Sequence, residues 1–171
     1  RLALVGETVD QVREVMIFGE SGILACSPPD RSPEWQATRQ RLLWPNGAEA
    51  HVFSAHEPEA MRGPQFDAAW ADELGKWKKG GDAWDQLQFA LRLGRNPRQV
   101  VTTTPRNTAV LKAILKNPST VITHAPTEAN RAYLAESFLA EVRARYGGTR
   151  LGRQELEGVL IEDEDGALWT T

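Results

Sequence analysis

The stretch that most constrains this chain is Asp67–Glu73, which reads Asp-Ala-Ala-Trp-Ala-Asp-Glu. A short apolar run ends in two acidic residues and is bounded by Gly63-Pro64 before it and Gly75 after it. Apolar runs of this length between turn residues are typical of a buried strand. Ligands bind at the carboxyl ends of the strands in an open parallel sheet, so Asp72 and Glu73 mark a candidate site.

The two acids have the chemistry that a nucleotide-hydrolysing site needs. Mg²⁺ prefers carboxylate oxygens, phosphates and water as ligands, which makes Asp72 a candidate metal ligand. Glu73, next to it, can orient or deprotonate an attacking water molecule. We interpret the pair as the Walker B arrangement of nucleoside triphosphatases. A strand that ends in a solvated acidic turn would give the same pattern.

A second β-branched run, Gln99–Thr104, is stopped by a proline, which cannot continue a central strand. Between the two runs, Asp82–Leu93 has the apolar spacing of a helix. Strand, helix and strand at this length predict a βαβ unit with parallel strands. We therefore expect Thr102, Thr103 and Thr104 at the same sheet edge as the acids, where their hydroxyls could sense a γ-phosphate or its water.

Three motifs occur together in this chain: Arg62–Gln65, Asp67–Glu73 and Val100–Arg106. In this combination the chain resembles the ATPase domain of the large terminase subunit of tailed phages and related gene transfer agents. The resemblance runs from Arg1 to about Gly166. It implies an α/β three-layer sandwich with a mainly parallel sheet of the P-loop NTPase type. It also implies a motor that uses ATP and Mg²⁺ to package double-stranded DNA into a procapsid in the bacterial cytoplasm.

The resemblance implies a role for each candidate site residue. Asp72 would hold Mg²⁺ through water, Glu73 would activate the hydrolytic water, and the three threonines would couple the γ-phosphate state to movement. Arg62 matches the family's trans-acting arginine, which would serve an adjacent subunit of a homo-oligomeric ring. A loop arginine paired with a nearby acid is the alternative. The implied protein partners are the portal protein and the small terminase subunit.

One motif of the family is missing from the sequence. The phosphate-binding pattern G-x-x-x-x-G-K-[ST] is absent, and Gly75-Lys76 is followed by Trp77. The chain also opens on Arg1 rather than methionine, which suggests a fragment. We expect a partial ATPase domain over 1–158, incomplete at its N-terminus, and a linker over 159–171 toward a nuclease domain outside this sequence. The acidic run 162–165 is expected to be a solvated turn, because adjacent acids point to alternate sides.

Length, charge and cysteine content limit the classes of protein to which this chain can belong. The 171 residues suit one domain, and the net charge of −3 gives no overall basic surface for nucleic acid. DNA contact would need a local patch, and Lys76–Lys79 is the compact candidate, although a solvated loop is the preferred interpretation. The single cysteine excludes a disulfide framework within the chain. No apolar run is long enough to span a membrane.

The rest of the chain predicts further elements. An Asn-Gly turn favours a hairpin of 41–44 with 49–53 at the sheet edge. From this hairpin His51 should point to solvent. The residues before it, 30–37, are expected to form a loop. Strands are also expected at 2–5, 120–123 and 159–161. Helices are expected at 9–18, with Thr8 as the cap, and at 130–146. Two more should begin after caps, one after Asn107 or Thr108 and one after Thr149.

Two other functions fit the same residues. A helicase-like translocase of the same ATPase class would share the acids and the threonines. A non-catalytic assembly module that binds the portal or the small terminase subunit would explain the missing phosphate-binding motif. The sequence upstream of Arg1 would separate them, because a strand followed by G-x-x-x-x-G-K-[ST] favours the motor.

Overall fold

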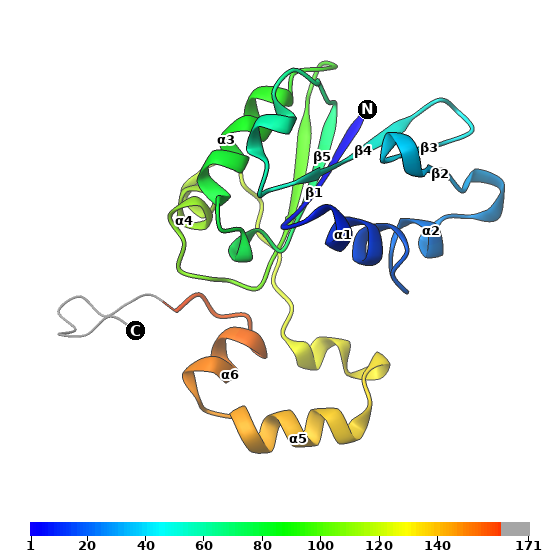
Figure 1. Cartoon of the computed structure of the whole chain (residues 1–171). Helices are drawn as coiled ribbons and strands as arrows, with labels where there is room; N and C mark the ends of the chain where they lie inside the picture. The colour runs from blue at the N-terminus through cyan, green and yellow to red at the C-terminus, as the bar shows by residue number, and fades with distance from the viewer. Residues whose placement is uncertain (162–171) are drawn as a thin grey trace. The chain divides into compact units, whose positions relative to one another are not determined.

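A computed structural model describes residues 1–161 of the chain (Figure 1). The acidic run at 162–165 therefore lies outside the described residues. The chain divides into two compact units, Arg1–Thr103 and Thr104–Thr171. The first unit contains the sheet, and the described part of the second is built from helices.

The first unit is built on an open, mainly parallel sheet, as the sequence predicts. The strand order is β2-β3-β4-β1-β5-β6, and β1 pairs parallel with both β4 and β5, while β5 pairs parallel with β6. The strand β3 runs antiparallel to both of its neighbours, β2 and β4. The strands are β1 (Leu2–Gly6), β2 (Glu34–Gln36), β3 (Arg41–Leu43), β4 (Glu49–Ser54), β5 (Ala68–Asp72) and β6 (Arg98–Thr102).

Helices cover both faces of this sheet, so β1 is buried along most of its length. On one face, α1 (Val9–Gln11) continues into the π-helical η1 (Val12–Ile17), which packs on Leu4 and its neighbours. The hydroxyl of Thr8 caps α1 by accepting a hydrogen bond from the Gln11 backbone N–H at 3.1 Å, which confirms the predicted cap. On the other side lies α3 (Gly80–Ala90), the helix of the βαβ unit (Figure 1).

The predicted hairpin forms, but it does not lie at the sheet edge. Its turn contains Gly47 at φ +83°, and β3 and β4 are antiparallel. However, β4 also pairs with β1, and the edge strand is β2, which lies in the stretch for which the sequence predicts a loop. The physical reason is Trp35 of β2: its ring packs against the core, with the Phe18 ring 6.1 Å away.

His51 does not point freely to solvent, contrary to the prediction. Because β4 is an interior strand, the side chain is half-buried, with its Nε2 2.9 Å from a Glu49 carboxylate oxygen. Its ring also lies 5.9 Å from that of Phe66.

The second unit contains three α-helices in its described part. They are α4 (Ala109–Lys116), α5 (Glu136–Tyr146) and α6 (Arg150–Glu155). Thr149 caps α6 with its hydroxyl, as predicted, and of the two candidates Asn107 and Thr108 it is Thr108 that caps α4. The helix predicted at 130–146 begins later, at Glu136, because 3₁₀ turns (η6, Thr127–Tyr133) precede it.

The first unit also contains five short helices: α2 (Ile23–Cys26), η2 (Pro29–Arg31), η3 (Ala37–Arg39), η4 (Pro58–Met61) and η5 (Leu74–Lys76).

The predicted strands at 120–123 and 159–161 are wrong. Neither segment pairs with a strand, and the side chain of Val121 is 90% exposed. β-Branched residues favour a strand only in the context of a paired neighbouring strand, and neither of these segments has one. Within residues 1–161, β6 pairs on one side alone, so the second βαβ unit is not formed.

Candidate functional site

The structure brings Asp72 and Thr102 together at the carboxyl ends of β5 and β6. The two residues are direct partners in the parallel register. The Thr102 hydroxyl donates a hydrogen bond of 2.6 Å to Asp72 Oδ1. Asp72 is half-buried, and a carboxylate accepts several bonds, so it keeps capacity for a cation.

Two tryptophans extend this network, and the sequence analysis missed both. The indole N–H of Trp70 donates to Thr102 Oγ1 at 2.9 Å, and that of Trp77 donates to the Asp72 carbonyl oxygen at 3.0 Å. The signal for Trp70 was available, since residues two apart on a strand share a face. Nothing in the local pattern indicated the bond from Trp77.

Glu73 leaves the strand in a left-handed conformation, at φ 52° and ψ 40°. This region is uncommon for a residue other than glycine, and such strain occurs often at functional sites. Its Oε2 is buried and makes no hydrogen bond within the described chain, although Lys76 Nζ lies 3.2 Å away. The contact is thus an ion pair without hydrogen-bond geometry.

The other two threonines differ in position. The Thr103 hydroxyl accepts a hydrogen bond from the Gly75 backbone N–H at 2.9 Å. This bond ties the end of β6 to η5, the turn that follows Glu73. Thr104 begins the second unit.

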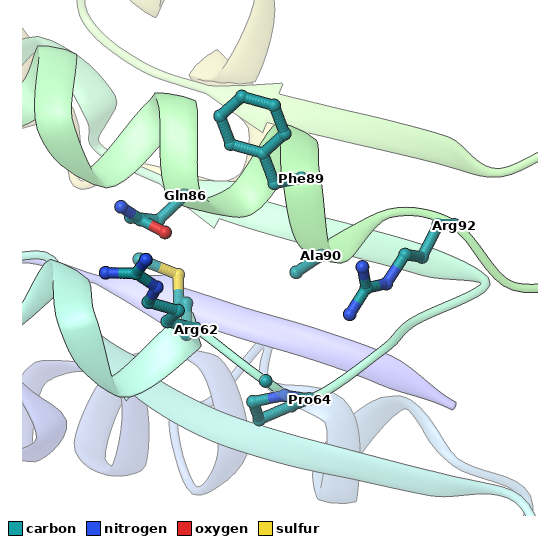
Figure 2. A pocket seen from close by; sticks show the side chains of 8 residues that line it. Arg62, Pro64, Gln86, Phe89, Ala90 and Arg92 are labelled. Carbon is teal, nitrogen blue, oxygen red and sulfur yellow. The ribbon is translucent and has the colours of Figure 1, made fainter.

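Arg62 lies in a separate cleft from the two acids. No hydrogen bond or ion pair within residues 1–161 joins it to them; its Nη1 lies 3.3 Å from Glu59, and both side chains are about three-quarters exposed. The cleft has a volume of about 510 Å³ and lies between η4 and the second half of α3 (Figure 2). Its lining includes Gln86, Phe89 and Arg92. An ion pair this exposed contributes little energy, so it would not hold Arg62 in place.

In the basic stretch Lys76–Lys79 the three lysines are exposed, while Trp77 between them is buried. Trp77 is only 5% exposed, so its ring is not available to stack on bases. Lys76 pairs with Glu73, and Lys79 donates to the His56 carbonyl oxygen. The exposed lysines agree with the solvated loop preferred from the sequence, and the buried Trp77 ring removes the aromatic contact from that candidate.

The donor set at Asp72 suits Mg²⁺ better than a metal that needs several protein ligands. Among the described residues, no three His, Cys, Asp or Glu side chains are grouped so that they could hold a metal ion. Mg²⁺ is usually held by one or two carboxylates together with phosphates and water.

Within residues 1–161, no helix is long and apolar enough to cross a membrane.

Known proteins match this chain both by sequence family and by fold. The family model described as "Terminase large subunit, T4likevirus-type, N-terminal" matches residues 1–171. The large terminase of a thermophilic bacteriophage superposes with a TM-score of 0.74 at 12% identity, over 94% of this chain and 40% of its own. That phage protein has also been solved in complex with ADP and with ATP-gamma-S. No curated protein matches the chain.

Two further solved structures have the same fold. The large terminase ATPase domain of Thermus phage P74-26 gives a TM-score of 0.60 at 17% identity, over 94% of this chain and 76% of its own. The large terminase of bacteriophage HK97 gives 0.62 at 16% identity, over 93% and 39%. The present chain thus spans about 40% of the length of the thermophilic phage protein.

Proposed function

Because this chain belongs to the T4-like large terminase N-terminal family, we propose that it is part of the ATP-hydrolysing motor that packages double-stranded viral DNA into a procapsid. The observation that carries the proposal is the Thr102–Asp72 hydrogen bond at the carboxyl end of the sheet, with Glu73 directly after it. This is where an open α/β sheet binds its ligand.

In this proposal each residue at the sheet edge has a defined task. Asp72 holds Mg²⁺ through water, and the bound ion would neutralise charge on the phosphates. Glu73 orients the hydrolytic water and takes its proton. Thr102 and Thr103 tie the end of β6 to Asp72 and to the turn after Glu73, so a shift at either acid would move β6. We place Thr104 in the same coupling motif.

The remaining parts of the proposal come from the family. ATP as the nucleotide is supported by the phage structures with ADP and ATP-gamma-S. Double-stranded DNA, the portal protein, the small terminase subunit and a homo-oligomeric ring are the proposed partners, in the bacterial cytoplasm. A gene transfer agent would use the same machinery. A strand followed by G-x-x-x-x-G-K-[ST] upstream of Arg1 would support the motor, and the absence of that motif would favour the non-catalytic assembly module.

The proposal is tested with Glu73→Gln in the full-length subunit. The amide keeps the shape of the side chain but cannot take a proton, so ATP turnover should fall by about 10² or more while nucleotide binding is retained. Steady-state hydrolysis and calorimetric titration measure the two quantities. The matched control is Glu34→Gln, an exposed glutamate in β2, which should leave turnover near wild type. Turnover near wild type in Glu73→Gln would place the general base elsewhere.

A further inference from the structure

Trp70 lies beside the candidate metal ligand in a way that the proposed function does not use. It precedes Asp72 by two positions on β5, and across the sheet it pairs with Val100, while Asp72 pairs with Thr102. We infer that Trp70 is a positioning residue: through the Thr102 hydroxyl, its indole N–H fixes the orientation of the Asp72 carboxylate. The inference rests on the proposed role of Asp72 as the residue that holds Mg²⁺.

The direction of this hydrogen-bond chain is fixed by the chemistry of its members. An indole N–H is a donor only, whereas a threonine hydroxyl has one donor and two acceptor lone pairs. Trp70 occupies an acceptor position of Thr102 at 2.9 Å, and the hydroxyl hydrogen is then directed to Asp72 Oδ1 at 2.6 Å. The second bond has the short length of a hydrogen bond to a charged acceptor.

Trp70, the first donor of this series of hydrogen bonds, is held in place by the hydrophobic core. The Trp70 side chain is half-buried and packs against the hydrophobic cluster that includes Leu4 and Met16. In the register of the sheet, Trp70 is the direct partner of Leu4 on β1. The indole therefore has a fixed place from which to donate. Oδ1 of Asp72 is committed to Thr102, which orients the remaining lone pairs of the carboxylate.

Without the indole N–H, the Thr102 hydroxyl would be oriented by Asp72 alone, and the pair would be less well held. In the full-length subunit, we expect Trp70→Phe to weaken Mn²⁺ binding in the presence of ADP by about 2- to 10-fold, the effect of losing one hydrogen bond. Electron paramagnetic resonance of free Mn²⁺ measures the affinity without any turnover. Thr102→Val should weaken binding at least as much, and Thr102→Ser, which keeps the hydroxyl, should restore it.

Trp84→Phe is the matched control, because Trp84 is a half-buried tryptophan on α3 and should leave Mn²⁺ affinity unchanged. The double variant Trp70→Phe/Thr102→Val should bind no more weakly than Thr102→Val, because both act through the same bond to Asp72. Additive losses, or no loss in Trp70→Phe, would overturn the inference. If Trp70→Phe fails to fold, benzothienylalanine at this position keeps the ring shape without the N–H and decides the question in the same assay.

The same assay separates this inference from the proposed function. Asp72→Asn should abolish most of the Mn²⁺ binding that depends on ADP. If Asp72→Asn binds like wild type, the metal site itself is misplaced. If it loses binding while Trp70→Phe and Thr102→Val do not, Asp72 holds the metal without help from Trp70.

Discussion

Asp72 and Glu73 are adjacent in the chain, yet the structure gives their carboxylates different surroundings. Asp72 Oδ1 accepts a short hydrogen bond from Thr102, whereas Glu73 Oε2 is buried near Lys76 without one. Two carboxylates in contrasting environments are typical of sites in which each has its own task. This contrast supports the proposed division of roles, with metal binding at Asp72 and water activation at Glu73.

Another carboxylate, Glu49, provides a test at the residue scale through pH. The hydrogen bond from His51, and then the positive charge of Arg41, hold the pKa of Glu49 below its usual value, although burial opposes them. A folded-state pKa below the unfolded value stabilises the protein above the unfolded pKa, and this contribution is lost as pH falls through the folded pKa. We expect Glu49→Gln to lower Tm at pH 7 by about 2–4 °C.

The difference in Tm between wild type and Glu49→Gln should shrink below about pH 4, because the wild-type carboxylate then becomes protonated. Thermal denaturation across a pH series measures it, with the exposed Glu34→Gln as the control. A gap in Tm that stays constant from pH 7 to pH 3 would show that Glu49 acts by shape and not by charge.

At the scale of elements, the sequence predicts what is decided locally. The caps at Thr8, Thr108 and Thr149 form because the hydroxyl and the amide that it accepts from are three residues apart. The apolar runs of β1 and β5 end at turn residues and form the predicted strands. These features need no knowledge of distant parts of the chain.

Features that depend on distant partners could not be predicted in this way. The run 120–123 has the composition of a strand, but no strand pairs with it. In contrast, Glu34–Gln36 forms a strand because the Trp35 side chain packs against the hydrophobic core. The candidate site follows the same rule. Parallel register places Asp72 beside Thr102, as the βαβ pattern predicts, but the bond from Trp77 depends on how its loop folds back.

At the scale of the whole molecule, the role of Arg62 can be tested by mixing subunits. If Arg62 acts on a neighbour, Arg62→Ala subunits should be inactive alone and should recover ATPase activity when mixed with Glu73→Gln subunits. Mixed rings then contain interfaces with an intact Glu73 facing an intact Arg62, and an arginine finger contributes about 10³-fold or more. The measurement is ATP turnover as a function of mixing ratio.

Ring formation and subunit exchange are established first by sedimentation, because rescue requires mixed rings. The control mixture pairs Arg62→Ala with Asp72→Asn/Arg62→Ala, in which no interface has an intact arginine, and it should show no rescue. No recovery in demonstrably mixed rings of Arg62→Ala and Glu73→Gln would leave Arg62 as a loop residue that pairs with Glu59.

The central claim is that the edge formed by Asp72, Glu73 and Thr102 is where the nucleotide and its metal bind. Crystals of the full-length subunit with ADP and Mn²⁺ in place of Mg²⁺ test it directly, because Mn²⁺ is located by its anomalous scattering. We predict a peak separated from the Asp72 carboxylate by one water molecule, with the nucleotide phosphates on its other side. A Mn²⁺–ADP peak at another part of the protein, with none beside Asp72, would contradict the claim.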